Sequence, residues 1–296
     1  MTDLAPHELR ILLAVERERS FTAAAAALGM SQPAVSHAVR VCEGKIGVVL
    51  FERGRSGARP TAAGERAVVH ARQVLRLLDL LGSEARGAES GVVEGELRIV
   101  AFRSAAAHVL PAALARLTER HPGLRPHVRV VRELGRGTAG EVADGRADLG
   151  IATLDGQAAA PGLLAGRLFE EAYALVSPAG HERPRGLPLV DWDENCGSYT
   201  RDWWGRQEWI PAARMNVEDD LATLAMVAQG VGMSIVPRLA LLAAPPGLDV
   251  TDLGPQGPSR TVGYVTTPEL ARSAAVRELI RELRSAPLPP GTSRVD

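Results

Sequence analysis

Four polar side chains, Gln32, Ser36, His37 and Arg40, recur at three- and four-residue steps near the N-terminus. On an α-helix this spacing places them along one face. Amide, hydroxyl, imidazole and guanidinium groups hydrogen-bond the base edges and phosphates of nucleic acids. The row therefore predicts a helix face that contacts a polyanion. The alternative is the solvated polar face of an ordinary helical hairpin, since short helical pairs are common.

The elements that must position this row are two helices and a tight turn. Alanine-rich sequence predicts the first helix over about Thr22–Leu28, and Gly29 suits its left-handed end. Ser31 fits the N-cap of the second helix, with Pro33 in its first turn. The apolar positions of the second helix are expected to point inward: Val35, Ala38, Val39 and Cys42. This is a helix-turn-helix, which places its second helix in the DNA major groove.

A basic hairpin is expected after the second helix. Gly47 ends that helix, Val48–Phe51 is predicted as a short strand, and a glycine-punctuated turn follows. Three arginines lie in the turn: Arg53, Arg55 and Arg59. A mobile arginine loop beside a groove-reading helix fits a polyanion. The sequence thus predicts a winged helix-turn-helix with a locally basic surface, although the net charge of the chain is −1.

The stretch SFTAAAAALGMSQPAVSHAVRVCEGKIGVVLFERGRSGARPTAAGE closely resembles the DNA-binding region of LysR-type transcriptional regulators. That family shows a Ser-Phe-Thr-x-Ala-Ala opening, Ser-Gln-Pro-Ala-Val/Leu-Ser, Leu-Gly-x-x-Leu-Phe-Glu-Arg and a Thr-x-Ala-Gly-Glu closing, and all four blocks are present in order. The chain departs from the family where Cys42 replaces a leucine and where Pro60 replaces an aliphatic residue. Gly44 within the helix is expected to weaken its last turn by ~1 kcal/mol relative to alanine.

The resemblance implies roles for nine residues. Four are expected to face base edges and the adjacent sugar-phosphate: Gln32, Pro33, Ser36 and His37. Three are expected to hold the DNA backbone: Thr22, Ser31 and Arg40. Two are expected to reach the flanking groove: Arg53 and Arg55.

A long amphipathic helix is predicted after Thr61, which can cap it, with Glu65 in the first turns. Its apolar residues recur at three- and four-residue steps up to Gly82: Val68, Ala71, Val74, Leu75, Leu78 and Leu81. A second copy of the chain would cover this narrow stripe, so we expect dimerisation; the alternative is packing on the chain's own second domain. Residues 85–91 are predicted as a hinge.

From Glu94 the chain alternates strands with helices, which points to a parallel sheet with crossover helices. The expected strands are Leu97–Ala101, Val128–Glu133, Asp148–Thr153, Glu171–Ser177, Gly232–Pro237 and Arg260–Thr266. The expected helices are Ala105–Arg120, one near Gly140–Asp144, Asp219–Gln229 and Ser273–Leu283.

This region resembles the family's effector-binding domain, a two-lobed α/β fold like that of periplasmic binding proteins. The fold class is therefore α+β multi-domain. We expect a DNA-binding domain over 1–61, a linker helix and hinge over 62–91, and an effector domain over 94–285. Lobe 1 is expected at about 94–168 and 262–285, and lobe 2 at about 169–261.

Ligands of open α/β sheets lie beyond the carboxyl ends of strands, near helix N-termini. Six residues meet that description and are the candidate effector contacts: Arg103, Ser104, Thr153, Tyr199, Thr200 and Arg201. Hydroxyls with an arginine at a helix N-terminus favour a carboxylate or another small anion. The competing interpretations are that Ser104 caps its helix and that Arg103 pairs with an acidic neighbour. Tyr199, Trp203 and Trp204 are cleft candidates, although aromatics in a chain with 4% of them are more often core residues.

Composition bounds the remaining interpretations. The 296 residues are 46% hydrophobic, enough for two or three packed units, and two cysteines argue against a disulfide framework. No zinc-ligand spacing, nucleophile elbow, dinucleotide fingerprint or P-loop is present, so we expect no enzyme, metal or cofactor. No long apolar run or signal-peptide pattern is found, so a cytoplasmic protein without membrane contact is expected.

The sequence thus predicts a dimeric or tetrameric regulator that binds double-stranded DNA under control of a small anionic effector. One alternative is a ligand-independent regulator whose second domain serves only assembly. Another is a solute-binding protein or small enzyme that carries an accidental helical hairpin.

Overall fold

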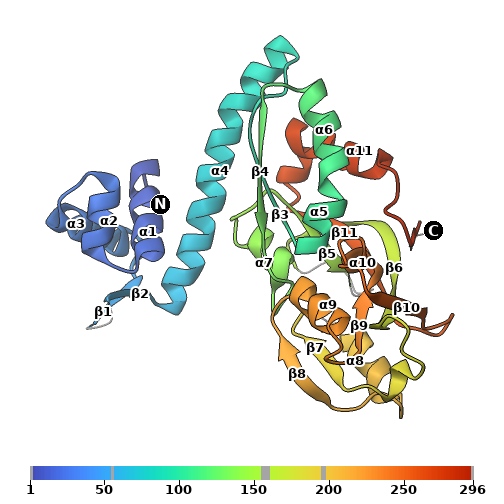
Figure 1. Ribbon diagram of the computed structural model, residues 1–296. Coiled ribbons are helices and arrows are strands. Elements are labelled where there is room, and N and C mark those ends of the chain that lie inside the picture. The colour runs from blue at the N-terminus through green and yellow to red at the C-terminus, as the bar shows by residue number, and fades with distance from the viewer. Residues whose placement is uncertain (1–2, 55–56, 155–160, 195–197, 295–296) are drawn as a thin grey trace. The chain divides into compact units, whose positions relative to one another are not determined.

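The computed structural model describes residues 3–54, 57–154, 161–194 and 198–294 (Figure 1). The chain divides into two compact units, Met1–Val92 with Asp144–Arg146, and Val93–Ala143 with Ala147–Asp296. The described helices include none that is long and apolar enough to cross a membrane.

Three helices, a hairpin and one long helix form the N-terminal unit. Its elements are α1 (Pro6–Glu18), α2 (Phe21–Leu28), α3 (Gln32–Ile46), β1 (Phe51–Gly54), β2 (Gly57–Pro60) and α4 (Ala62–Ser90). Apolar side chains of the first three helices and the hairpin share one buried core, which includes Leu12, Val15, Val35, Val39 and Phe51. The unit therefore holds a hydrophobic centre of its own.

The strand of the hairpin starts later than the sequence predicts. Val48 and Val49 are 47% and 60% exposed and lie outside β1, so the predicted strand Val48–Phe51 is wrong. The reason is the Glu43 carboxylate, which accepts hydrogen bonds from the backbone N–H groups of Leu50 at 2.8 Å and Phe51 at 3.2 Å. A side chain of α3 thus takes up these N–H groups, and the pairing of β1 with β2 begins only at Phe51.

Helix α4 runs without interruption to Ser90, so the predicted hinge over 85–91 is wrong. Thr61 caps its start, accepting from the Gly64 N–H at 3.0 Å, as predicted. Two glycines allow α4 to end here. Gly91 adopts φ 70° and donates to the Gly87 carbonyl, and a Cβ on Gly87 would lie 2.8 Å from the Val92 carbonyl oxygen. They allow the chain to turn closely around the helix end.

A mixed sheet forms the centre of the second unit, in the order β10-β6-β11-β5-β3-β4. Its strands are β3 (Gly95–Ala101), β4 (Leu124–Val130), β5 (Leu149–Leu154), β6 (Leu164–Pro178), β10 (Leu248–Asp252) and β11 (Ser259–Thr266). Strands β3, β4 and β5 are parallel, as predicted, and β11 returns antiparallel between β5 and β6.

The long strand β6 belongs to two regions of this sheet. Its first part, Leu164–Ala172, pairs with β11, and its second part pairs with β9 (Ser234–Pro237) and β10. The parallel pair β7 (Leu189–Trp192) and β8 (Ala213–Val217) adjoins the second region through a bridge between Leu189 and Met233. One continuous strand thus connects both regions.

Helices cover the sheet regions (Figure 1). They are α5 (Arg103–His108), α6 (Leu110–Arg120), α7 (Gly137–Ala143), α8 (Ser198–Gly205), α9 (Asp220–Ala228), α10 (Arg238–Leu241) and α11 (Ala274–Ser285). The single predicted helix Ala105–Arg120 is wrong, because two helices meet at Val109. Pro111 starts the second one, since proline lacks the N–H that a continuous helix would use there.

The predicted strand Val128–Glu133 is also displaced, since β4 ends at Val130. The cause lies in the loop after it, where the Glu133 carboxylate accepts hydrogen bonds from the N–H groups of Thr138 in α7 and Thr153 in β5. Because its side chain is anchored in this way, Glu133 does not continue the pairing of β4 with β3.

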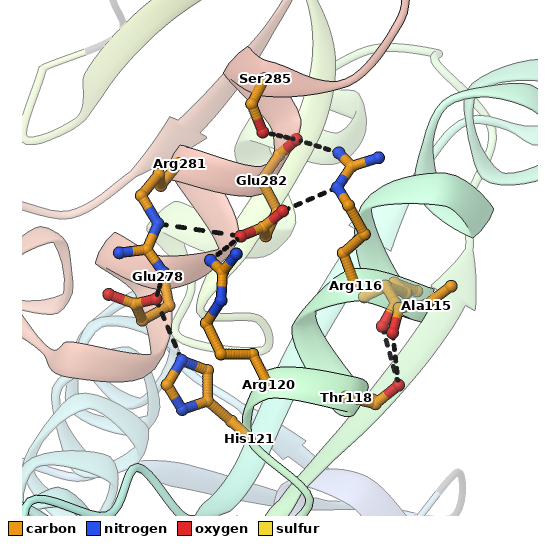
Figure 2. Close-up of polar contacts among 10 residues, drawn as sticks. Ala115, Arg116, Thr118, Arg120, His121, Glu278, Arg281, Glu282 and Ser285 are labelled. Carbon is orange, nitrogen blue, oxygen red and sulfur yellow. Dashed lines mark hydrogen bonds and ion pairs between the residues drawn. The ribbon is translucent and has the colours of Figure 1, made fainter.

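A carboxylate fastens α11 to α6 in the second unit (Figure 2). Glu282 is buried and accepts from Arg116 Nε at 2.8 Å and from Arg120, while His121 lies 3.0 Å from Glu278. The Arg116 guanidinium is the main reason that the pKa of Glu282 lies below its ordinary value. This network holds the last helix against the first part of the domain.

Candidate functional site

The turn between α2 and α3 has the geometry that the sequence predicts. Gly29 adopts φ 63°, and its N–H donates to carbonyls of the preceding helix. Ser31 caps α3 by accepting from the Ala34 N–H at 3.3 Å. Thr22 lies exposed near the start of α2. A tight turn over 29–31 therefore joins the two helices, with Gly29 ending the first and Ser31 capping the second.

Helix α3 separates an apolar face from a polar one. Val35, Val39 and Cys42 are at most 1% exposed, and Ala38 is half-buried beside them. The exposed residues of α3 include four of the predicted nucleic-acid contacts: Gln32, Pro33, His37 and Arg40. These side chains are free to meet a ligand surface.

Ser36 differs from the prediction. It is 5% exposed, so its hydroxyl does not lie on the open polar face. The position falls about 100° around the helix from Val35, at the boundary of the two faces, where a short side chain is covered by its neighbours. The prediction that Ser36 lies along the exposed row is wrong in this respect.

The hairpin arginines are described only in part. Arg53 lies in β1, where its backbone pairs with Ala58, and Arg59 is exposed in β2. Arg55 lies outside the described residues. The hairpin itself, predicted from this stretch, is confirmed by the four-residue pairing of β1 with β2.

An ion pair that was not predicted from the sequence stabilises this unit. Lys45, at the end of α3, lies 2.8 Å from both carboxylate oxygens of Glu8. This ion pair lowers the pKa of Glu8 and raises the pKa of Lys45. Lys45 thus ties α3 to α1, and its charge is largely compensated.

In the second unit Arg103 begins α5, after the first strand, as predicted. Its guanidinium pairs with Asp219 at 3.4 Å and with the buried Asp220, both at the start of α9. The interpretation that Arg103 pairs with acidic neighbours is therefore confirmed. Ser104 is buried, and the N-cap of α5 is Phe102, so the alternative that Ser104 caps its helix is wrong.

Thr153 lies at the end of β5, as predicted, next to a buried carboxylate. Its N–H donates to Glu133 at 3.3 Å, and Thr138 donates to the same carboxylate from its hydroxyl at 2.9 Å. Burial raises the pKa of Glu133, and these hydrogen bonds oppose that rise. The Thr153 hydroxyl is itself buried, and none of the described residues hydrogen-bonds to it.

Glu194 interacts with Glu133 and with Arg103. The Glu133 backbone N–H donates to its carboxylate, Arg132 lies 3.4 Å from it, and burial raises its pKa. Its charge also acts on Arg103, whose own pKa is lowered, chiefly by burial. We call this group the interlobe cluster: Arg103, Arg132, Glu133, Thr153, Glu194, Asp219 and Asp220.

The remaining predicted contacts, Tyr199, Thr200 and Arg201, lie in the first turn of α8, which follows β7 along the chain, so they lie near a helix N-terminus as expected. Thr200 is fully buried, and none of the described residues hydrogen-bonds to its hydroxyl. Arg201 pairs with Asp191 at 2.7 Å and lies over the Trp204 ring at 4.5 Å. Tyr199 lies in the first turn, and its side chain is outside the described part.

Trp203 and Trp204 belong to a buried cluster with Tyr173, Met233 and Ile235, in line with the core interpretation. Sequence reasoning missed the buried ion pair of Arg260 with Glu171, whose atoms lie 2.6 Å apart. Glu171 also accepts from the Leu239 N–H at 2.8 Å. No local pattern indicates such a pair, because the partners come from strands far apart in the chain.

Each of the two units matches a known protein family. Residues 90–287 match the family model described as LysR substrate binding domain, and residues 6–65 match that of the bacterial regulatory helix-turn-helix protein, lysR family. The probable HTH-type transcriptional regulator LrrA of Synechococcus elongatus is 35% identical over 251 residues, 81% of this chain and 83% of that protein. A probable hydrogen peroxide-inducible genes activator of Streptomyces viridosporus is 30% identical over 302 residues, 94% of this chain and 93% of that protein.

Solved structures show the same architecture. A full-length OxyR variant from Pseudomonas aeruginosa aligns with a TM-score of 0.72 at 24% identity, covering 100% of both chains. Full-length CbnR in complex with its target DNA aligns with a TM-score of 0.67 at 22% identity, covering 95% of this chain and 99% of the other. LysG from Corynebacterium glutamicum, with bound effector Arg, aligns with a TM-score of 0.63 at 19% identity, covering 95% and 97%.

Proposed function

The chain belongs to the LysR family of bacterial transcriptional regulators, and on that premise we propose that α3 docks in the major groove of promoter DNA. The observation that carries the proposal is the division of α3 into a buried apolar face and an exposed row with Gln32, His37 and Arg40. Groove-reading helices present amide, imidazole and guanidinium groups in this way. DNA binding also places the protein in the cytoplasm, where the chromosome lies.

The decisive experiment is a gel shift with the DNA upstream of the gene, at moderate ionic strength and with excess bulk competitor. We expect preferential retention of one upstream fragment. The Arg53→Ala variant should weaken binding to all sequences and reduce the salt slope by about one, as loss of a phosphate contact does. Equal competition by bulk DNA would refute the proposal.

We propose further that α4 pairs with α4 of a second copy. Its exposed apolar residues are Val74, Leu77, Leu78 and Leu81. Two DNA-binding units held by such a pair would contact inverted half-sites about one helical turn, or a multiple of ~10 bp, apart.

For the second unit we propose that a small anionic effector binds at the interlobe cluster. Arg103 and its partners Asp219 and Asp220 span α5 and α9, so a ligand carboxylate that takes the guanidinium must displace the aspartates. Exchange of one anion for another would release α9 from α5 and alter lobe closure. The buried hydroxyl of Thr153 offers the ligand a hydrogen bond.

A cationic effector is the second candidate. Arg103 is already compensated by two aspartates, and Glu133 and Glu194 add buried carboxylates whose raised pKa values reflect the cost of desolvating their charge. A ligand ammonium or guanidinium would offset that cost. LysG, with its bound effector Arg, shows such a ligand in a protein of this fold.

Calorimetry of the full chain with mono- and dicarboxylates and with L-arginine separates these cases. An anionic effector predicts heat with a carboxylate that the Arg103→Gln variant loses. A cationic effector predicts heat with L-arginine that Glu194→Gln loses and Arg103→Gln keeps. Absence of heat with every compound would favour the ligand-independent alternative, in which the second unit serves only assembly.

Several relatives are named as hydrogen peroxide-inducible activators, so the cysteines of this chain matter. Cys42 is fully buried in α3, and burial raises its pKa to about 11. Peroxide reacts with the thiolate, which is scarce at such a pKa. We propose that Cys42 is a core residue and takes no part in redox sensing; Cys196 lies outside the described residues.

A further inference from the structure

A pocket of about 510 Å³ opens in the second unit, and none of its lining residues belongs to the interlobe cluster. Four segments build it: the joint between α5 and α6, the first part of β6, the end of α11, and the chain after α11. Ligand pockets in proteins commonly have volumes of roughly 300–1,000 Å³. The space is therefore sufficient for a small organic molecule.

Three arginines line this pocket, Arg167 from β6, Arg284 from α11 and Arg294 from the C-terminal segment. Within the described part of the chain no carboxylate lines the pocket, and none forms an ion pair with these three side chains. Arg284 is held in place, since it donates to the Tyr264 hydroxyl at 2.8 Å and lies 5.5 Å from that ring. Among the residues that the structure describes, the site thus presents positive charge that no carboxylate neutralises.

This arrangement is unlike that of four other arginines of the second unit. Arg103, Arg116, Arg201 and Arg260 each lie beside an aspartate or glutamate. Like charges gathered in one hollow repel each other, which costs stability unless an anion is present. Guanidinium groups bind carboxylate and phosphate oxygens in bidentate fashion.

The remaining walls are apolar. Val109, Ala112, Phe169 and Leu283 line the pocket, together with three prolines of the C-terminal segment, Pro287, Pro289 and Pro290. Such walls favour a hydrocarbon body over water. His108 adds little charge, because burial, with help from Arg103, lowers its pKa.

We propose that this pocket is a second ligand site, which binds an organic oxyanion with an apolar body. The charged head, a carboxylate or a phosphate monoester, lies among Arg167, Arg284 and Arg294, and the body lies against the apolar walls. The site communicates with the interlobe cluster through α5, which carries His108 at the pocket and Arg103 at the ion pairs with α9. Occupancy therefore acts on the helix that holds the two lobes together.

The test is calorimetry of the full chain with hexanoate, hexyl phosphate, inorganic phosphate, hexylamine and 1-hexanol. We expect heat with hexanoate or hexyl phosphate and none with the amine or the alcohol. The hexanoate and hexyl phosphate arms identify the preferred head group, and inorganic phosphate shows how much the charge contributes alone.

The Arg167→Gln/Arg294→Gln double variant should weaken that binding at least tenfold. Both side chains are exposed, so the variant should fold, which circular dichroism checks. The matched control is Arg183→Gln, an exposed arginine outside the pocket, which should bind as the unaltered chain does. Arg103 belongs to the proposed effector site and does not line this pocket, so the Arg103→Gln variant should retain hexanoate binding.

Two results would overturn the proposal. One is no heat with either amphiphilic anion at millimolar concentration. The other is binding that the double variant keeps and Arg103→Gln abolishes, which would assign the anion to the interlobe cluster.

Discussion

Replacing Leu81 by aspartate should separate paired copies of α4. The exposed apolar residues of this helix, Val74, Leu77, Leu78 and Leu81, are 45%, 45%, 41% and 68% exposed. Full burial of such a side chain is worth ~1.5–3 kcal/mol, so covering these exposed fractions yields about 3–6 kcal/mol for each helix. A symmetric pair gains twice that amount.

Leu81 supplies about a third of this gain, and an aspartate there would also place two carboxylates at the interface. We expect the dissociation constant of the pair to rise at least ~100-fold, which corresponds to about 3 kcal/mol. Sedimentation velocity over a concentration series measures the change. The measurement uses residues 1–92, which make up all of the first compact unit except Asp144–Arg146 and contain its core, so that assembly through the second unit does not contribute.

Leu81 is exposed and lies on a capped helix, so Leu81→Asp should remain folded, and circular dichroism checks this. In the same fragment Val49→Asp is the matched control, since Val49 is a 60% exposed apolar residue outside α4. A folded Leu81→Asp fragment that sediments as the same dimer at every concentration would refute the assignment of this stripe to self-association.

Four further predictions concern the two units separately. His37→Ala should reduce discrimination between specific and bulk DNA by ~1–3 kcal/mol, measured by competition gel shift; unchanged discrimination would remove His37 from base reading. Gly44→Ala should raise the free energy of unfolding by ~1 kcal/mol, because no atom lies within 4 Å of the added Cβ. Gly64→Ala should lower the free energy of unfolding by several times that amount, since its Cβ would lie 2.0 Å from the Leu50 carbonyl oxygen; urea melts of both variants measure the two changes. Cys42, with its pKa raised from 9.0 to about 11, should alkylate at least ~100-fold more slowly than a free thiol, and mass spectrometry of the native protein after iodoacetamide treatment checks this. The pKa of Glu282 is lowered in the fold, so the stability from its ion pairs is present above the ordinary pKa of 4.5 and is lost as pH falls through the folded value; Glu282→Gln should cost ~2 kcal/mol at neutral pH and flatten this acid dependence in urea melts.

Local patterns predicted the N-terminal unit well. The caps at Ser31 and Thr61 and the left-handed Gly29 follow from residue type alone, and all three are confirmed. The buried face of α3 follows from helical spacing. Ser36 was misplaced because spacing does not report what covers the edge of a face.

The strands of the second unit were also foreseen, but their limits were set by distant partners. Strand β6 begins well before the predicted Glu171, because Leu164–Glu170 pair with β11 from near the end of the chain. Strands β7, β8 and β10 were missed, since runs of four or five residues are too short to show a strand pattern.

The candidate effector contacts were the least predictable part. The positions of Arg103 and Thr153 follow from the rule that ligands meet the ends of strands. Their partners Asp219, Glu133 and Glu194 come from other segments, and only the folded chain brings them together. For the same reason no sequence pattern indicated the arginine-lined pocket, whose walls come from four separate segments.

The continuous strand β6 has a consequence for biosynthesis. The hydrogen-bonding edge of its first part, Leu164–Ala172, stays open until β11 leaves the ribosome, because β11 is the strand that pairs with it. Truncated chains that end before β11 should expose this apolar edge and aggregate, and the finished domain should melt in a single calorimetric transition. The domain can therefore complete its fold only after β11 has been synthesised.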